Sequence, residues 1–328
     1  MRFVMIALAV SLAFGQATRV FRLTQNENQQ QLQEIATLLR ATADLPQVSV
    51  NDTEKTVSVG GAAGQIAIAG WLINQIDLPA TAQLSGVHEY RPPAGGDDVV
   101  RVFYVSHAST PQELQEIVTA LRSVADIRRL FVYNALKAVA ARGTAQQISL
   151  AAWMLDQLNQ PAGVAAPSPH DYKLPGDDLA RVFELTHAQS PQQLQEIVVT
   201  LRAIGDIQRV FMCNGRRAVV LRSTAERVAL AAWLVKELDR PASAPGTAAE
   251  GTAPHEFLLS NDPANVVRVF SLNGFNSPQE RQKVVAQVRA NARIQRLFVY
   301  NALGALTVRG TAGQVATAEK VIEEMRAQ

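Results

Sequence analysis

The spacing of hydrophobic positions between residues 101 and 161 predicts the element order β-α-β-β-α. Short runs of β-branched and aromatic residues favour strands. Hydrophobic residues that recur at intervals of three and four favour a helix with one apolar face. The expected elements are a strand at 102–105, a helix from Pro111 to Val124, a strand at 130–133, a turn at 134–137, a strand at 138–142 and a helix from Thr144 to Leu158.

Polar residues mark the beginnings of both helices. Thr110 can cap the first helix, Pro111 suits its first turn, and Glu113 can reach back to the cap. Thr144 and Gln147 have the spacing of a second capping box. The pattern therefore predicts two helices that cover one face of a small three-stranded sheet.

The same pattern occurs four times along the chain of 328 residues. The tripeptide Arg-Val-Phe opens each copy, and its occurrences are 82, 80 and 87 residues apart. We therefore expect an α+β protein of four tandem βαββα modules with a KH-like arrangement. The expected modules span residues 18–80, 88–161, 170–241 and 255–328, and their first arginines are Arg19, Arg101, Arg181 and Arg268.

Segments rich in Pro, Ala and Gly separate the modules and are typical of surface linkers. After each linker, a histidine, an acidic residue and an aromatic residue follow one another. We expect each of these strings to form a short extra strand that turns back into the first strand of the module. The linkers are 79–86, 161–169 and 241–254, and the strings begin at His88, His170 and His255.

Three tryptophans occupy one equivalent position in the second helix of the first three modules. Trp71, Trp153 and Trp233 are predicted to be buried in the cores of their own modules, because a module of about sixty residues has a marginal core and an indole adds a large buried area. The fourth module has Lys320 at this position.

The N-terminal segment has the pattern of a secretory signal peptide. Arg2 is followed by a hydrophobic run from Phe3 to Phe14, and small residues follow at Gly15 and Ala17. We expect residues 1–17 to be a signal peptide that is cleaved after Gly15 or Ala17; a buried core helix is the alternative. The mature protein is then exported to the periplasm, with association at the outer membrane left open, and no later segment is apolar for long enough to span a membrane.

The composition of the chain argues against two classes of binding partner, nucleic acids and anionic membranes. The net charge is +2, only 18% of residues are charged, and no basic block stands out. These values give no electrostatic footprint for nucleic acid or for an anionic membrane. The hydrophobic fraction of 48% allows packed cores.

Histidines and paired aspartates are the first candidates for a metal site. Besides the three strings, histidines occur only at His107 and His187, and the repeated positions are explained by duplication of a whole module. A metal ion needs several ligands that converge on one point, and neither set supplies them. We expect no metal site, and we expect Asp97-Asp98 and Asp177-Asp178 to be turn residues.

Two further patterns have simple structural explanations. The G-x-x-G stretches at 61–64 and 310–313 resemble the loop with which KH domains bind nucleic acid, but the other two copies lack the second glycine, so a helix start is expected. Cys213 is the single cysteine, at a position where two other modules have Tyr133 and Tyr300, so we expect neither a disulfide nor a catalytic thiol. We predict no catalytic residue, no cofactor and no enzymatic activity.

Two sequence features accompany the β-α-β-β-α order. The third strand ends in Arg-Gly-Thr at 142–144 and 309–311, and the second helix ends in Leu-Asp-x-Pro at 238–241, with near variants at 76–79 and 158–161. With these features the chain resembles the periplasmic N-terminal modules of secretins, the outer-membrane channels of type II and type III secretion and of type IV pili. The resemblance covers four blocks but no C-terminal pore domain.

The resemblance implies a scaffold or docking role in the bacterial envelope. In secretins, such modules stack into rings and dock partners from the inner membrane. The partners expected here are envelope proteins, including a secretin-type complex, and homo-oligomerisation is left open. The alternative is a periplasmic protein that binds a peptide or glycan in grooves between its modules.

Overall fold

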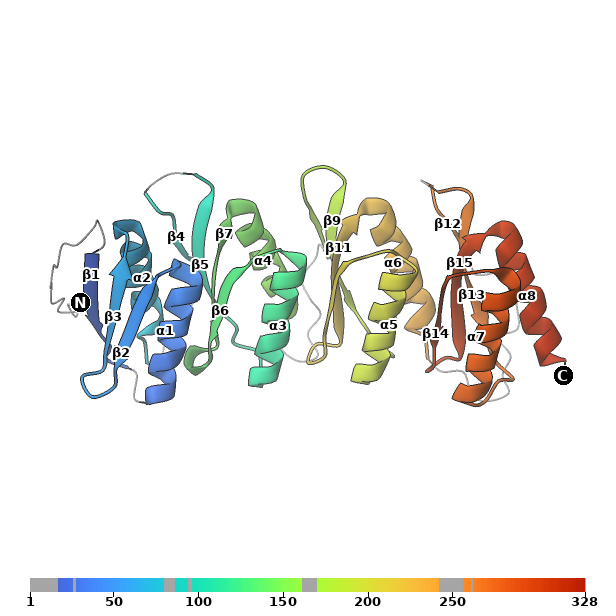
Figure 1. Cartoon of the computed structure of the whole chain (residues 1–328), viewed down its shortest axis with the longest axis horizontal. Helices are drawn as coiled ribbons and strands as arrows, with labels where there is room; N and C mark the ends of the chain where they lie inside the picture. Colours follow the sequence, from blue (N-terminus) through green and yellow to red (C-terminus); the bar gives the residue numbers. More distant parts are fainter. Residues whose placement is uncertain are drawn as a thin grey trace. The chain divides into compact units, whose positions relative to one another are not determined.

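The computed structural model describes residues 17–25, 28–79, 86–93, 96–160, 170–241, 256–260 and 262–327. The chain forms two compact units, Met1–Pro167 and Ser168–Gln328, and each unit contains two modules (Figure 1). The predicted signal peptide, apart from Ala17, lies outside the described residues, as do most linker residues and His255. Strand β1 begins at Ala17, so cleavage after Gly15 would leave the strand whole.

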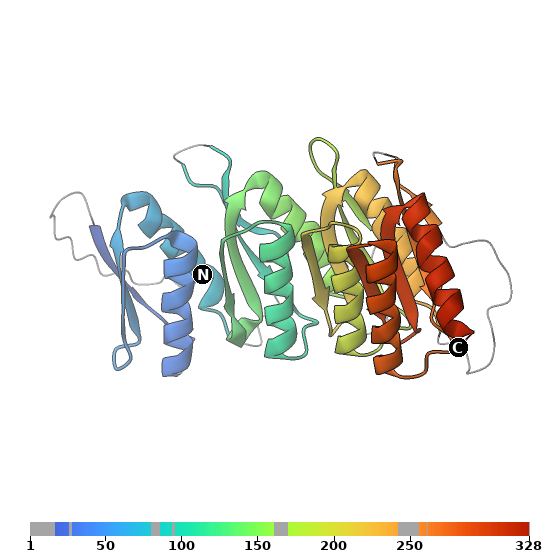
Figure 2. The same cartoon turned by 45° about the vertical axis from the view of Figure 1, so that its right-hand side comes forward.

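The first module has a three-stranded antiparallel sheet in the order β1-β3-β2. Both helices lie on one face of this sheet (Figures 1 and 2). The elements are β1 (Ala17–Arg22), α1 (Gln29–Ala43), β2 (Gln47–Asn51), β3 (Thr56–Gly61) and α2 (Ala63–Ile76).

The second module adds an edge strand, so its antiparallel sheet has the order β4-β5-β7-β6. The edge strand is the first of the predicted histidine strings. The elements are β4 (His88–Tyr90), β5 (Asp98–Tyr104), α3 (Pro111–Val124), β6 (Arg129–Tyr133), a short 3-10 turn (Asn134–Leu136), β7 (Ala138–Thr144) and α4 (Ala145–Leu158).

The second unit repeats the four-stranded arrangement twice, in the orders β10-β11-β9-β8 and β12-β13-β15-β14. Its first module contains β8 (Asp171–Lys173), β9 (Asp178–Glu184), α5 (Pro191–Ala203), β10 (Arg209–Cys213), β11 (Ala218–Thr224) and α6 (Ala225–Leu238). Its second module contains β12 (Glu256–Leu258), β13 (Asn265–Ser271), α7 (Pro278–Ala292), β14 (Arg296–Tyr300), β15 (Ala305–Thr311) and α8 (Ala312–Arg326). The predicted α+β fold of four repeated modules is confirmed.

The predicted helix caps are present. The Thr110 hydroxyl accepts a hydrogen bond from the backbone N–H of Glu113 at 3.2 Å. The Glu113 carboxylate accepts one from the N–H of Ser109 at 2.6 Å, one residue before the predicted position. Thr144 and Gln147 form the second capping box as predicted. At each start, one N–H of the first helical turn and one N–H at or just before the cap residue are thus paired.

The prediction that both aspartates of each pair are turn residues is wrong for the second one. Asp98 and Asp178 are the first residues of strands β5 and β9. Their carboxylates pair across the sheet with Arg142 at 2.6 Å and with Arg222 at 2.8 Å. These arginines are half-buried, so an acidic partner offsets the cost of removing their charge from water.

The acidic residue that ends the second helix also has a structural role. In the third module, the Asp239 carboxylate accepts hydrogen bonds from the backbone N–H groups of Thr186 at 2.6 Å and His187 at 2.7 Å. Asp77 holds Thr24 and Gln25 in the same way in the first module. The Leu-Asp-x-Pro ending therefore fixes the loop between the first strand and the first helix.

None of the helices in the described part of the chain combines the length and the hydrophobicity that crossing a membrane requires.

Candidate protein-docking surfaces

Within the first unit, the helices of the first module cover the free face of the next module's sheet (Figures 1 and 2). One hydrophobic cluster joins Leu38 and Leu39 of α1 to Tyr133, Ala138 and Ala140 of the second sheet. The sheet of the second module is therefore buried on both faces, with its own helices on the other side. We call the covered face of such a sheet the docking face.

The second unit contains the same arrangement. Val269, Tyr300 and Ala305 of the fourth module belong to one hydrophobic cluster with Leu194 and Leu201 of α5 in the third. Helix α5 packs along β14, as α1 packs along β6. Docking of one module's helices on the next module's sheet is thus a repeated property of the chain.

A glutamate and an asparagine mark each of these contacts. The Glu34 carboxylate of α1 accepts hydrogen bonds from the backbone N–H and the side-chain amide of Asn134, both at 3.1 Å. Glu196 of α5 accepts the same pair of bonds from Asn301, at 2.8 and 2.9 Å. Because a carboxylate has several acceptor sites, one side chain can satisfy both donors and set the register of the helix on the sheet.

An arginine from the docking face completes the polar frame. Arg309 donates to the carbonyl oxygen of Ile204, the C-cap residue of α5, at 3.1 Å. Arg142 donates to the carbonyl of Thr42, near the end of α1, at 3.5 Å. Cationic side chains interact favourably with the carbonyl end of a helix. The arginine of the Arg-Gly-Thr pattern therefore contacts the preceding module, a role that the local sequence pattern did not indicate.

The prediction that the tryptophans are buried in the cores of their own modules is wrong. Trp71, Trp153 and Trp233 are all only partly buried. Trp71 stacks on Tyr90 of the next module with ring centroids 5.7 Å apart, and Trp233 lies 5.8 Å from Phe257 of the next module. The indoles therefore add apolar area to the docking contact.

These contacts also give the histidine strings a role. His88 Nδ1 lies 2.7 Å from the side-chain oxygen of Gln75 in the preceding module, and its ring meets Tyr104 edge-on at 5.1 Å. The Tyr104 hydroxyl donates to the backbone carbonyl of Gln75 at 2.8 Å. In the second unit, Phe257 of the third string contacts Trp233 of the preceding module, so a residue of the first and of the third string takes part in a docking contact.

Burial changes the acidity of the tyrosines at these contacts. It raises the pKa of Tyr104 to about 12. It also raises the pKa of Tyr300 to about 12, and the carboxylates of Asp239 and Glu196 add to this effect. Burial, followed by the charges of Glu34 and Asp77, raises the pKa of Tyr133. These hydroxyls therefore stay protonated throughout the physiological pH range.

The first sheet and the last helix pair have polar outer faces instead. Ser49 and Asn51 stand on β2 where the second module has Phe131 and Tyr133, and both are exposed. On α7, Lys283 takes the place of the glutamate, and Gln287 and Asn291 follow on the same helical face, all exposed. On α8, Lys320 replaces tryptophan, and 77% of its side chain is accessible. Neither surface offers the apolar area that a further module of this kind would cover.

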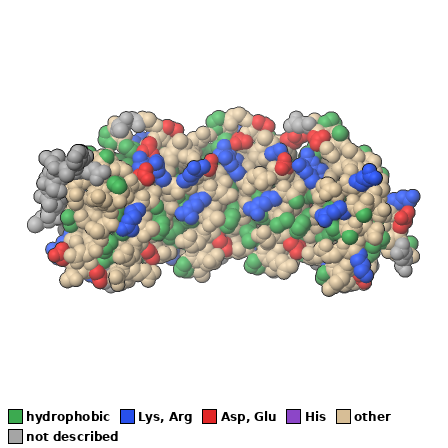
Figure 3. Space-filling model, viewed as in Figure 1, with side chains coloured by type: hydrophobic (Ala, Val, Ile, Leu, Met, Phe, Trp, Pro, Cys, Tyr) green, Lys and Arg blue, Asp and Glu red, His purple; other side chains and the backbone are tan. Residues whose placement is uncertain are grey.

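The remaining candidates from the sequence form no reactive site. Among the described residues, no three His, Cys, Asp or Glu side chains lie close enough to hold a metal ion. Cys213 is a buried residue of β10, and its thiol is not part of a disulfide. The two G-x-x-G stretches enclose the starts of α2 and α8 as predicted. On the face shown in Figure 3, Lys and Arg side chains are spread among uncharged ones and form no single basic patch.

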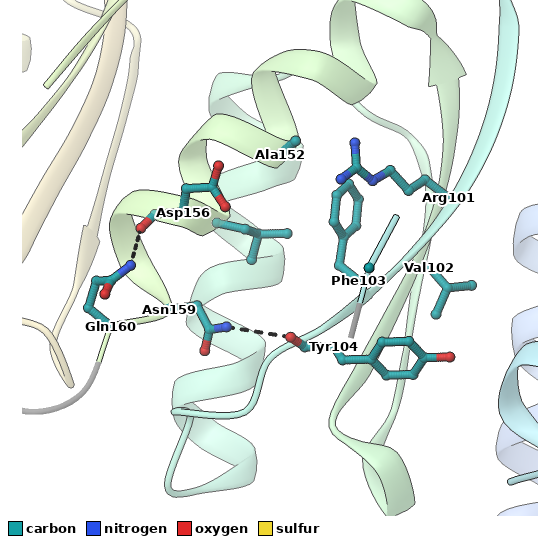
Figure 4. Close-up of a pocket in the computed structure, with 10 residues that line it drawn as sticks. Arg101, Val102, Phe103, Tyr104, Ala152, Asp156, Asn159 and Gln160 are labelled. Carbon is teal, nitrogen blue, oxygen red and sulfur yellow. Dashed lines mark hydrogen bonds between the residues drawn. The ribbon is translucent and has the colours of Figure 1, made fainter. Parts of the chain in front are cut away.

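A small pocket lies in the second module between strand β5 and the last turn of α4 (Figure 4). Its volume is about 190 Å³. Arg101, Phe103, Ala152, Asp156, Asn159 and Gln160 are among the residues that line it. Polar groups dominate the lining, so the pocket suits a small polar group rather than an apolar ligand.

Comparison with known proteins finds likeness of structure only. No protein-family model matches the chain, and no curated protein matches it. Structural matches include ExeD of Aeromonas hydrophila, at 16% identity and a TM-score of 0.17, over 69% of this chain and 42% of that one. The N-terminal domain of the secretin XcpQ from Pseudomonas aeruginosa matches at 14% identity and a TM-score of 0.19, over 45% of this chain and 68% of that one.

The likeness also extends outside secretins. Dim2p of Pyrococcus horikoshii matches at 12% identity and a TM-score of 0.24, over 44% of this chain and 93% of that one. The chain spans less than half the length of ExeD. At such identities the similarity to secretin N-terminal domains concerns the fold, and activity or partners do not follow from it.

Proposed function

We propose that this chain is a non-enzymatic scaffold or docking protein of the bacterial envelope that serves a secretion or pilus assembly. The observation that carries the proposal is the repeated docking of helices on the next module's sheet. The distinctive residues shared by the modules, such as Glu34 and Glu196, Asn134 and Asn301, and the tryptophans, are used in these contacts. A catalytic site, by contrast, gathers unlike ionisable groups in one cleft.

The placement in the envelope rests on two further supports. The sequence predicts a signal peptide over residues 1–17, and the modules have the fold of secretin N-terminal domains, which are periplasmic. We propose export to the periplasm and contact with a protein of the envelope, including a secretin-type complex at the outer membrane.

Site-specific cross-linking in the source bacterium tests the proposal. The full chain would carry a photoreactive amino acid at one exposed position per module, and adducts would be identified by mass spectrometry. We expect adducts with a component of a secretion or pilus machine, from the periplasmic fraction, and a mature N-terminus at Gln16 or Thr18. The matched control has the photoreactive group at the buried position Val220, which should give no adduct with another protein.

A different pattern would contradict the proposal. Retention of the uncleaved chain in the cytoplasm would remove the envelope role. Adducts spread over abundant periplasmic proteins without preference would remove the specific docking role.

The alternative of a peptide- or glycan-binding protein has less support. Its best sequence evidence was the three tryptophans, because aromatic faces exposed in a groove could stack on a ligand. Trp71 instead stacks on Tyr90 of the next module, and Trp233 contacts Phe257 of the next module at a tilt. Their rings are therefore already occupied.

A further inference from the structure

The arginine that opens each module has the same immediate neighbour in all four copies. Its guanidinium lies over the phenylalanine two residues later in the same strand. The distances from guanidinium carbon to ring centroid are 5.0, 4.8, 5.7 and 5.5 Å for Arg19, Arg101, Arg181 and Arg268. The four arginines can therefore be compared as one position in four surroundings.

In the two modules of the second unit this arginine has acidic partners. Arg181 pairs with Asp171 of the edge strand β8. Arg268 pairs with Glu256 of the edge strand β12 and also with Glu319 of α8, at 2.7 Å. Asp171 and Glu256 stand directly opposite these arginines in the sheet. A half-buried guanidinium is thereby neutralised by carboxylates from two directions in the fourth module.

In the second module the equivalent arginine, Arg101, has no such acidic partner. Glu89 stands opposite Arg101 in the sheet, but its carboxylate pairs with Arg91 at 3.0 Å. Ala152 of α4 occupies the place that Glu319 has in α8. Within the described residues, Arg101 forms no ion pair, and its buried Nε has no hydrogen-bond partner.

The pocket of about 190 Å³ lies beside this arginine. Figure 4 shows the Arg101 guanidinium over the Phe103 ring and directed toward Ala152, the position from which Glu319 reaches Arg268 in the fourth module. The methyl side chain of Ala152 thus leaves room where the fourth module has a carboxylate.

We propose that this pocket binds a carboxylate group presented by a partner protein, as an Asp or Glu side chain or a chain terminus. The fourth module supplies the internal precedent, because Glu319 fills the equivalent place with this group. Glu319 accepts a hydrogen bond from Nη1 of Arg268, so a carboxylate in the equivalent place would bond a terminal nitrogen of the Arg101 guanidinium and neutralise its charge. The inference deepens the proposed docking role and rests on it for the identity of the ligand's carrier.

The wall opposite the arginine explains why a single negative charge is the fitting ligand. Asp156 is exposed, and its side chain lines the same pocket. Its negative charge would repel a phosphate with two charges more strongly than a carboxylate with one. Asn159 and Gln160 are uncharged.

Titration of the whole mature chain with sodium acetate tests the pocket independently of any partner. The readout is the NMR signal of the Arg101 Nε–H group, assigned by its loss in Arg101→Lys. We expect a saturable shift with acetate, a much smaller one with sodium chloride at equal ionic strength, and a weaker response to phosphate. Equal responses to acetate and chloride, or stronger binding of phosphate, would overturn the proposal.

A matched set of variants tests the same site by stability. Ala152→Glu should raise the melting temperature above that of Ala152→Gln, which adds similar volume without charge, and should abolish the acetate response. The control is Ala232→Glu in the third module, where Arg181 already holds Asp171, so a smaller gain is expected. If the melting temperature of Ala152→Glu is no higher than that of Ala152→Gln, the inference that the Arg101 guanidinium lacks a carboxylate partner at this place is wrong.

The link to a partner is tested separately. If the cross-linked envelope partner binds through this pocket, Ala152→Glu should reduce capture of that partner at least tenfold. Ala152→Gln is the control for the added volume. If acetate binds but Ala152→Glu does not change capture, the pocket binds a carboxylate, but the partner protein does not supply it. Loss of all specific capture in the wild type would instead count against the proposed function.

Discussion

At the scale of single residues, the role of a charged or hydroxyl group in this chain depends on the residue that it contacts on a neighbouring strand or module. Asp98 and Arg142 meet because their strands are neighbours, although 44 residues separate them. Tyr104 points away from its own helices and donates to a carbonyl of the preceding module. A hydroxyl in that position is stable only while it keeps its proton.

The raised pKa of Tyr104 predicts a loss of stability in alkali. The pKa is about 12 in the folded chain against an ordinary value of 10.0, so the folded state holds this proton more tightly than the unfolded state. The contribution is fully present below pH 10 and falls as the pH rises from about 10 toward 12. Urea unfolding at several pH values should show this fall, and Tyr104→Phe should make it shallower.

Tyr104→Phe also loses one hydrogen bond, which lowers the free energy of unfolding at neutral pH by about 1 kcal/mol. The slope with pH, rather than the neutral value, tests the raised pKa. An unchanged slope in this variant would show that other groups cause the alkaline loss.

At the scale of elements, the first helix of a module serves two sheets. One face of α5 fills its own core with Leu194 and Leu201, and another presents Glu196, Thr200 and Ile204 to the next module. Thr200 and Ile204 have no exposed surface. Helix α7 has the inner face but not the outer one, because Lys283, Gln287 and Asn291 are exposed. Comparison of the two equivalent helices thus shows that the residues on the outer face of α5 are the ones that serve docking.

Glu196→Ala should destabilise the contact between the third and fourth modules. Its carboxylate accepts two hydrogen bonds from Asn301, and loss of such charge-assisted bonds lowers the free energy of unfolding by about 1 to 2 kcal/mol. Hydrogen exchange of β14 and urea unfolding would measure the effect. Lys283→Ala, at the equivalent exposed position, is the control and should change stability by less than about 0.5 kcal/mol. Equal effects of the two substitutions would show that the glutamate does not hold the helix on the sheet.

At the scale of the whole molecule, docking within each unit is heterologous: a helical face of one module meets the sheet face of the next. Such contacts propagate when an unoccupied helical face and an unoccupied sheet face are both suited to docking. The face of β2 carries Ser49 and Asn51, and the outer faces of α7 and α8 carry Lys283 and Lys320. Burial of these polar groups without partners would cost free energy, so the two faces do not favour each other.

Light scattering of residues 18–328 should therefore give a mass that stays constant as concentration rises. A variant in which the β2 face and the outer faces of α7 and α8 are made apolar should associate as concentration rises. It combines Ser49→Phe, Asn51→Tyr, Lys283→Glu, Gln287→Ala, Asn291→Val and Lys320→Trp. The control keeps Ser49 and Asn51 and carries only the last four substitutions, and it should stay monomeric. A wild-type mass that rises to a discrete multiple would show that a different surface mediates self-association.

The sequence alone determined the elements, their order and the fourfold repeat, because these depend on local periodicity, caps and turn residues. Thr110, Pro111 and Thr144 mark helix starts that the structure has at the predicted places. The sequence also contained an unused signal: β2 alternates apolar and polar residues, whereas β6 is nearly continuous in hydrophobic ones. Continuous hydrophobicity indicates a strand that is covered on both faces.

Only the tertiary structure decided what each buried face is buried against. Trp71 and Trp233 were predicted to be buried, and periodicity could not distinguish their own core from the next module's edge strand. Glu34 and Asn134 lie 100 residues apart in sequence, and Arg101 differs from Arg268 through Ala152, which lies 51 residues away along the chain. Local patterns determine which side of an element is buried. The partner on that side depends on contacts between distant segments, and only these contacts showed the docking surfaces and the missing ion pair of Arg101.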